Sequence, residues 1–86
     1  MKLRFTVHAR DKFFTLERHN FKVTEEAVIE AVSKPERIER ARNDRFIAER
    51  TLDETHLIRV IYEIRDEEIV IITFYPARRS RYEDQI

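Results

Sequence analysis

The first half of the chain carries the pattern of one short strand followed by two helices. Residues 3–7 alternate between apolar and polar side chains, which predicts a strand. Over residues 9–18 the apolar positions recur three and four residues apart, so one face of a helix is predicted to be buried. Thr24 is suited to cap a second helix, because two glutamates follow it in the first turn, and Pro35 ends this helix.

The second half of the chain changes to the period of strands. Residues 36–42 predict an edge strand whose many charges oppose pairing with other chains. Three further strands are predicted over residues 45–52, 57–64 and 69–75, with turns at 43–44, 53–55 and 65–67. The sequence therefore predicts an α+β fold in the order β-α-α-β-β-β-β, with two helices packed on one face of a four-stranded, mostly antiparallel sheet.

Alternation sorts the residues of the last two strands into two faces. The face under the helices is predicted to carry Ile58, Val60, Tyr62, Ile64, Val70, Ile72 and Phe74. The open face is predicted to carry Leu57, Arg59, Ile61, Glu63, Ile69, Ile71, Thr73 and Tyr75, with Glu49 beside them. A face this apolar is expected to be covered by the C-terminal tail or by a partner chain, including a second copy of this chain.

The bulk composition limits the classes of protein to which the chain can belong. Its 86 residues suffice for one domain, spanning residues 1–86. There is no apolar run of about 18 residues and no pattern of a secretion signal, so we expect a cytoplasmic protein that makes no contact with a membrane. The absence of cysteine excludes disulfides and thiolate zinc sites.

Charged residues make up 40% of the chain but cancel, with 17 basic against 17 acidic side chains. This charge content, together with the absence of glycine, is typical of thermophilic proteins, which rely on ion-pair networks and few flexible residues. The absence of glycine also excludes phosphate-binding loops of the glycine-rich type. Because the net charge is zero, any attraction to nucleic acid has to come from local clusters of basic residues.

Four segments of the chain carry a resemblance to a known superfamily. They are, in order, HARDKFFTLERHNF, TEEAVIEAVSKP, LIRVIYEI and IVIITFYPARRSRYE. The chain resembles small proteins of a domain-of-unknown-function branch that begin with a His-Ala-x-x-(x)-Arg helix and end in a V-x-T-x-Y-P strand, and its ending ARRSRYE resembles that of BrnT-type toxins. Both groups belong to the RelE/ParE-like superfamily. Asn20 stands where these families usually have glycine, a change that a left-handed backbone tolerates.

The resemblance implies a RelE/ParE-like fold and a metal-independent ribonuclease toxin, controlled by an antitoxin protein that is encoded beside it. ParE-type relatives inhibit DNA gyrase instead, so membership of the fold does not decide the activity. The alternative function is a protein-binding module that keeps the fold without catalysis, or an inhibitor of another enzyme. No cofactor is implied, and the three histidines lack the spacing of metal ligands, so we expect no metal site. His19 and His56 are expected on the surface.

The candidate residues for RNA cleavage lie on the predicted open face, at the first helix and in the tail. The 2′-OH of RNA can attack the neighbouring phosphate when a site supplies positive charge, a base and an acid. We expect Arg59, Arg78 and Arg79 to clamp the phosphate, because a guanidinium matches two phosphate oxygens. The candidate catalytic residues are Arg59, Glu49, Arg78, Tyr75, Tyr82 and His8, and the candidate RNA-binding residues are Arg79 and Arg81.

Each of these candidates also has a structural alternative. Arg59 beside Glu49 or Glu63 fits a cross-strand ion pair equally well. The arginines of residues 78–81 fit a solvated tail, the tyrosines fit packing roles, and His8 fits a local bond to the C-terminal tail. The deciding quantity is whether the clamp residues converge in space.

Overall fold

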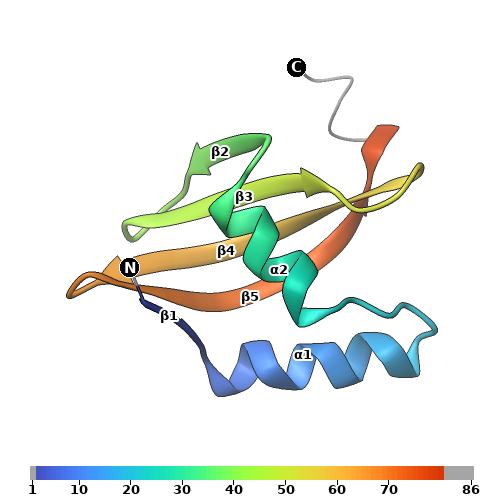
Figure 1. The fold of residues 1–86 in the computed structure, drawn as a ribbon, viewed down its shortest axis with the longest axis horizontal. Helices are drawn as coiled ribbons and strands as arrows, with labels where there is room; N and C mark the ends of the chain where they lie inside the picture. Colours follow the sequence, from blue (N-terminus) through green and yellow to red (C-terminus); the bar gives the residue numbers. More distant parts are fainter. Residues whose placement is uncertain (1, 81–86) are drawn as a thin grey trace.

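The structure, a computed structural model, describes residues 2–80 of the chain. Within this range two helices and five strands follow in the order β-α-α-β-β-β-β (Figure 1). Their bounds are β1 Lys2–Phe5, α1 Val7–Arg18, α2 Glu25–Ser33, β2 Arg37–Arg40, β3 Arg45–Thr51, β4 His56–Arg65 and β5 Glu68–Arg78. No helix among the described residues is long and apolar enough to cross a membrane.

The strands form one mixed sheet in the order β1-β5-β4-β3-β2. β1 runs parallel to β5, and every other neighbouring pair is antiparallel. The predicted α+β class and the predicted order of elements are confirmed. The prediction of a four-stranded sheet is wrong, because the short N-terminal strand β1 also pairs along β5 and makes a fifth strand.

Capping hydroxyls fix where both helices begin. The Thr24 hydroxyl accepts a hydrogen bond from the backbone N–H of Ala27 at 3.1 Å, as expected of the residue before α2. The Thr6 hydroxyl accepts a bond of the same length from Ala9 at the start of α1. β1 therefore ends at Phe5, earlier than predicted, because the chain leaves the strand to cap the helix.

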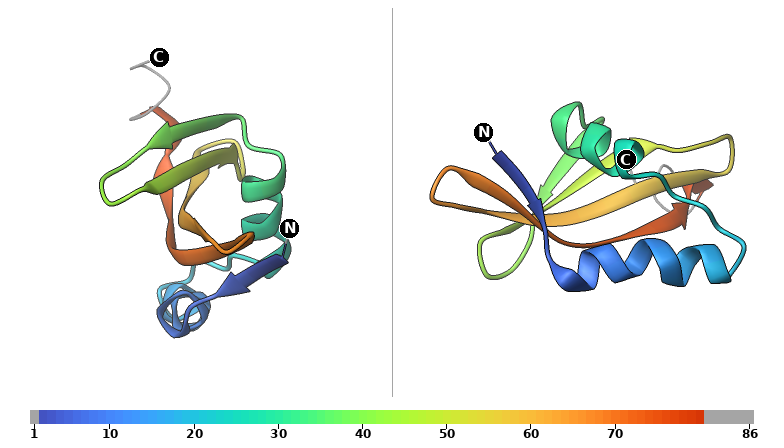
Figure 2. Two further views of the ribbon diagram at one scale, coloured as in Figure 1. Left: turned by 90° about the vertical axis from the view of Figure 1, so that its left-hand side faces the viewer. Right: turned by 60° about the horizontal axis from the view of Figure 1, so that its bottom comes forward.

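Both helices pack on one face of the sheet around a single core. α2 lies against β3 and β4, and α1 lies against β5 (Figure 2). The rings of Phe13 on α1 and Phe74 on β5 are 4.6 Å apart, while Val28 of α2 is fully buried in the same core. The prediction that both helices cover the same face is confirmed.

β5 contains an irregular step opposite β4. Ile61 pairs with Thr73, but its neighbour Tyr62 pairs with Ile71, so Ile72 is left without a partner on β4. An extra residue of this kind is a β-bulge, and it moves the side chains on one side of the step to the opposite face of the sheet.

The bulge corrects three of the predicted side-chain positions. Ile71 was predicted on the open face, but it is fully buried in the core under the helices, and Ile69 packs against the same core. Val70 was predicted under the helices, but it pairs with Glu63 and shares the open face with that residue. The apolar run of β5 is continuous, so alternation alone cannot reveal where the extra residue lies.

Candidate active site

Arg59 lies on the open face within a row of cross-strand partners. The row crosses four strands, from Arg37 on β2 through Glu49 on β3 and Arg59 on β4 to Tyr75 on β5. Arg59 Nη1 lies 3.2 Å from Glu49 Oε2, and Arg59 Nη2 lies 3.5 Å from Glu39 Oε1. Arg59 and Glu49 expose only 6% and 3% of their surface, so the alternative of a cross-strand ion pair is confirmed for them.

The predicted clamp of Arg59 with Arg78 and Arg79 does not form. Arg78 pairs with His56, whose side of β4 is the face under the helices, whereas Arg59 lies on the opposite face. The expectation failed because β5 continues through Pro76 to Arg78, so that strand alternation carries Arg78 to the face opposite to Arg59. Arg81 and Tyr82 lie outside the described residues.

Two other predicted catalytic residues, Tyr75 and His8, lie near the open face. Tyr75 is the cross-strand partner of Arg59, whose guanidinium carbon lies 5.9 Å from the centre of the tyrosine ring. His8 Nε2 lies 3.2 Å from the Thr73 hydroxyl on β5, so its local bond is to a strand residue. Arg59 and Glu49 are instead buried against each other as an ion pair.

A hollow of about 560 Å³ lies where β4 begins and β5 ends. It is lined by Phe21, His56, Tyr75, Pro76, Ala77, Arg78 and Ser80. The hollow brings a histidine, an exposed arginine and the ring of Phe21 together from three parts of the chain. We take it as the candidate active site, because it combines a group that can move a proton with a group that can bind an anion.

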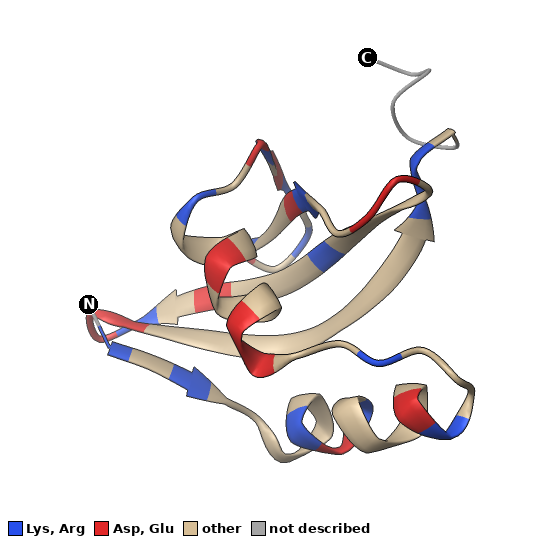
Figure 3. Ribbon diagram, turned by 45° about the vertical axis from the view of Figure 1, so that its right-hand side comes forward, with Lys and Arg blue, Asp and Glu red and all other residues tan. Residues whose placement is uncertain are grey.

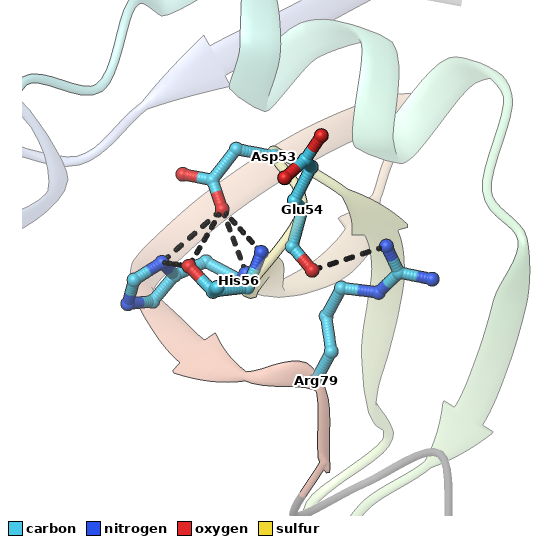
Figure 4. A network of polar contacts seen from close by, with 5 residues as sticks. Asp53, Glu54, His56 and Arg79 are labelled. Atoms are coloured by element: carbon cyan, nitrogen blue, oxygen red, sulfur yellow. Dashed lines mark hydrogen bonds and ion pairs between the residues drawn. The ribbon is translucent and has the colours of Figure 1, made fainter.

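His56 is held in place by the turn that precedes it. Asp53 Oδ1 accepts hydrogen bonds from the backbone N–H groups of Thr55 at 2.9 Å and His56 at 2.8 Å (Figure 4). The same oxygen lies 3.2 Å from His56 Nδ1, and the Thr55 hydroxyl lies 2.8 Å from that nitrogen. In the tautomer that donates from Nδ1 to the carboxylate, Nε2 is an acceptor at the far end of the ring. The side chain of His56 is 26% exposed, so it remains accessible.

Arg79 ties the end of β5 to this turn. Its backbone N–H donates to the Thr55 carbonyl at 2.9 Å, and its Nη1 lies 3.5 Å from the Glu54 carbonyl oxygen (Figure 4). These contacts hold the His56 turn beside Arg78. The structure therefore gives Arg79 a positioning role, while its predicted role in binding RNA stays a prediction.

Phe21 reaches the hollow because α1 ends in a left-handed turn. Asn20 has a φ of 62°, which confirms the left-handed backbone expected at this position. The Phe21 N–H then bonds back to the Leu16 carbonyl at 2.9 Å. The ring of Phe21 lies edge-on to the His56 ring with the two centres 4.9 Å apart.

Arg78 is an exposed cation that lines the hollow. The side chain is exposed, and none of the carboxylates in the described part of the chain lies within 4.0 Å of it. Figure 3 shows the basic end of β5 beside the acidic β3–β4 turn, which carries Asp53 and Glu54. The carboxylate of Asp53 is engaged by the backbone of the His56 turn.

A larger hollow, of about 790 Å³, lies at the opposite end of the sheet. It is lined by Lys2, Arg4, Arg65, Asp66, Glu67 and Glu68. Arg4 is paired with Glu68 at 3.0 Å, and Arg65 is paired with Glu63. This hollow contains neither a histidine nor an aromatic side chain, so its size does not make it the better candidate. Among residues 2–80, no three His, Asp or Glu side chains gather in a way that could hold a metal ion.

The hydrogen bonds to Asp53 make a prediction about acid stability. The bond from the Thr55 N–H, helped by those from His56, lowers the pKa of the Asp53 carboxyl below its ordinary value of 3.8. A lowered pKa in the folded state stabilises the fold above the unfolded pKa, and this contribution is lost as the pH falls through the folded pKa. We expect the unfolding free energy of Asp53→Asn, followed by urea titration, to fall less steeply below about pH 4 than that of the unsubstituted protein. If the unfolding free energies of the two proteins fell equally steeply with pH, the lowered pKa of Asp53 would be contradicted.

Sequence reasoning placed His56 on the surface and gave no role to Asp53 or Phe21. The sequence does contain a signal that links Asp53 to His56. Asp53 is followed two and three residues later by Thr55 and His56, which is the spacing of a turn in which a carboxylate caps the backbone. The approach of Phe21 carries no comparable local signal. No family model matches the chain, and no curated protein and no solved structure shows similarity to it.

Proposed function

We propose that this protein is a toxin-type, metal-independent endoribonuclease with a RelE/ParE-like fold, and that the hollow beside His56 is its active site. The observation that carries the proposal is the direct cross-strand pairing of His56 with Arg78 at one hollow, with Asp53 behind the imidazole. Proton transfer by His56 and charge stabilisation by Arg78 are the two requirements of a metal-free attack by the 2′-OH.

The proposed reaction assigns one role to each of the three residues. His56 Nε2 accepts the proton of the 2′-OH as the oxygen forms a bond to phosphorus, and the bond from phosphorus to the 5′-oxygen breaks. The imidazolium then returns the proton to that leaving oxygen, which gives a 2′,3′-cyclic phosphate and a 5′-OH end. Arg78 stabilises the negative charge on the phosphoryl oxygens. Asp53 orients the ring and stabilises the imidazolium while the proton is held there.

Arg78 provides the first test of this proposal. We expect Arg78→Gln to slow RNA cleavage by about 10²–10³-fold, as for the loss of one charge-stabilising donor in other enzymes. Arg78→Lys should retain more activity than Arg78→Gln, because an ammonium keeps the charge without the two-pronged geometry. The rate would be measured on a short labelled RNA in the presence of EDTA.

The matched control for Arg78 is Arg42→Gln, which removes an exposed arginine remote from the hollow. Its cleavage rate should equal that of the unsubstituted protein. If the Arg42 and Arg78 variants are both folded and cleave RNA at equal rates, Arg78 is not part of the active site. Cleavage that EDTA abolishes would contradict the proposed chemistry.

The alternative function, a protein-binding module without catalysis, has one observation in its favour. Val7 and Phe14 lie two turns apart on one side of α1 and are 79% and 66% exposed. Exposed apolar side chains in this arrangement suit contact with another protein, and a toxin also needs an antitoxin to bind it. The alternative predicts that His56 and Arg78 can be replaced without effect on the activity of the protein in cells.

A further inference from the structure

The outer edge of the sheet at β2 carries charges of both signs around one exposed apolar side chain. β2 is the last strand of the sheet, and β3 is its one neighbouring strand among the described residues (Figure 1). We propose that this edge binds the β2 edge of a second copy of the chain, antiparallel, with Ile38 at the two-fold axis. The contact is independent of the proposed function, because no residue of β2 lines the hollow beside His56.

The backbone of β2 has hydrogen-bonding groups that point away from the sheet. In an antiparallel ladder, successive residues direct their N–H and C=O groups alternately toward one side of the strand and toward the other. The Ala41 N–H donates to the Arg45 carbonyl at 2.7 Å, so the alternate residues Arg37 and Glu39 also face β3. Ile38 and Arg40 therefore direct their backbone groups outward, where they form a template for another strand.

The charges of β2 match those of a second β2 in one antiparallel register. When Ile38 faces Ile38 of the second copy, Arg37 of each copy faces Glu39 of the other. A shift by two residues brings Arg37 onto Arg37 or Glu39 onto Glu39, and like charges directly opposite each other are destabilising. A shift by one residue sets outward-directed backbone groups against inward-directed ones, so no ladder forms. The charges that disfavour pairing with other strands therefore favour this one pairing.

The side chains of β2 are already placed for this contact. Ile38 is 51% exposed and pairs with Ala48, which is buried in the core, so the two isoleucines meet on the face that carries the helices. Arg37 and Glu39 lie on the opposite face, where Arg37 Nη2 is 3.5 Å from Glu39 Oε1. The same oxygen of Glu39 lies 3.5 Å from Arg59 Nη2. Because these contacts order both charges within one copy, little further ordering is needed when the second copy binds.

The opposite edge of the sheet does not offer the same match. β1 has the sequence Lys-Leu-Arg-Phe, so a second β1 supplies no acidic partner for Lys2 or Arg4. At β2, the proposed register also brings Glu36 opposite Arg40 of the second copy. One oxygen of Glu36 already accepts hydrogen bonds from Thr51, so the centre of the contact, at residues 37–39, carries most of the association.

Sedimentation velocity of the full chain tests whether the dimer forms. Two four-residue strands bury less surface than the roughly 1,200–2,000 Å² of stable interfaces, so we expect the mass to rise from one chain to two between about 10 µM and 1 mM. Salt at about 1 M, which shortens the screening length to about 3 Å, should weaken the dimer. A chain that stays monomeric over this range of concentration at low salt would overturn the proposal.

Residue 38 meets itself across the two-fold axis, which permits a complementation test. Ile38→Lys and Ile38→Glu should each weaken self-association by about 5- to 30-fold, because like charges replace an apolar pair. An equimolar mixture of the two variants should restore association, because opposite charges then face each other. The matched control is Ile64→Lys, since Ile64 is 49% exposed but lies on β4, two strands from the edge, and this variant should associate like the unsubstituted protein.

A single cysteine tests the register directly, because the chain has no cysteine of its own. The Cα atoms of a hydrogen-bonded antiparallel pair lie about 5.5 Å apart, a separation that a disulfide spans. Oxidation should therefore link Ile38→Cys into a covalent dimer. Arg40→Cys should stay unlinked, because the two copies of residue 40 lie about 13 Å apart along the strands.

Three results would overturn the proposal. The first is a dimer that Ile38→Lys leaves unchanged, which another surface such as the open face would then form. The second is a mixture of folded Ile38→Lys and Ile38→Glu that does not associate. The third is equal cross-linking of the two cysteine variants.

Discussion

Replacing His56 by glutamine should slow RNA cleavage by about 10²–10⁴-fold, the usual contribution of a positioned acid or base. Glutamine keeps a polar side chain of similar reach but cannot accept and return a proton. The side chain of His56 is partly exposed, so the fold should tolerate the change. Rates would be compared under single turnover on one short RNA, with the far-ultraviolet circular dichroism of each protein recorded beside them.

His19→Gln is the matched control for His56→Gln. His19 caps the end of α1 through its backbone and is exposed, and it does not line the hollow. Its cleavage rate should equal that of the unsubstituted protein. A His56 variant that is folded and cuts RNA at the unsubstituted rate would contradict the assignment of the active site.

Replacing Glu49 by glutamine should lower the free energy of unfolding by about 3 kcal/mol or more, because it leaves the buried guanidinium of Arg59 without its closer carboxylate. Glu39 is farther from Arg59 and lies 35% exposed, so it offsets only part of this loss. The measurement is urea unfolding near neutral pH. A chain of 86 residues has a stability of about 4–13 kcal/mol, so a loss of this size is readily detected.

Two further variants separate the buried charge from other effects. Glu17→Gln removes an exposed carboxylate from α1 and should change stability by no more than about 0.5 kcal/mol. The double variant Glu49→Leu with Arg59→Met removes both charges and should recover most of the loss, because an apolar pair replaces a buried ion pair at little cost. Unaltered stability of Glu49→Gln would show that the carboxylate does not hold Arg59 in solution.

The sequence predicted the elements well where local rules apply. Thr24 caps α2, Asn20 adopts the left-handed conformation, and the order of strands and helices follows from their periods. The short strand β1 was predicted as a strand, but its pairing with β5 depends on contacts between distant parts of the chain. The elements themselves were therefore predicted, but the number of strands in the sheet was not.

The candidate site was predicted only in part, for reasons of register. Arg78 was expected past the end of the last strand and beside Arg59, but it lies within β5 and its cross-strand partner is His56. Arg59 was expected either to bind phosphate or to form an ion pair, and only the pairing of β3 with β4 places Glu49 opposite it. Phe21 meets His56 through the turn after α1 and the packing of that helix, which no local pattern specifies.

The chemistry of the cut ends tests the central claim most directly. Labelled RNA, both free and in translating ribosomes, would be incubated with the protein in EDTA, and the new ends would be identified by mass spectrometry. The proposed active site predicts 2′,3′-cyclic phosphate and 5′-OH ends, and a single 2′-deoxy substitution before the cut should prevent cleavage there. Intact RNA in both preparations, or products that carry 3′-OH ends, would contradict it.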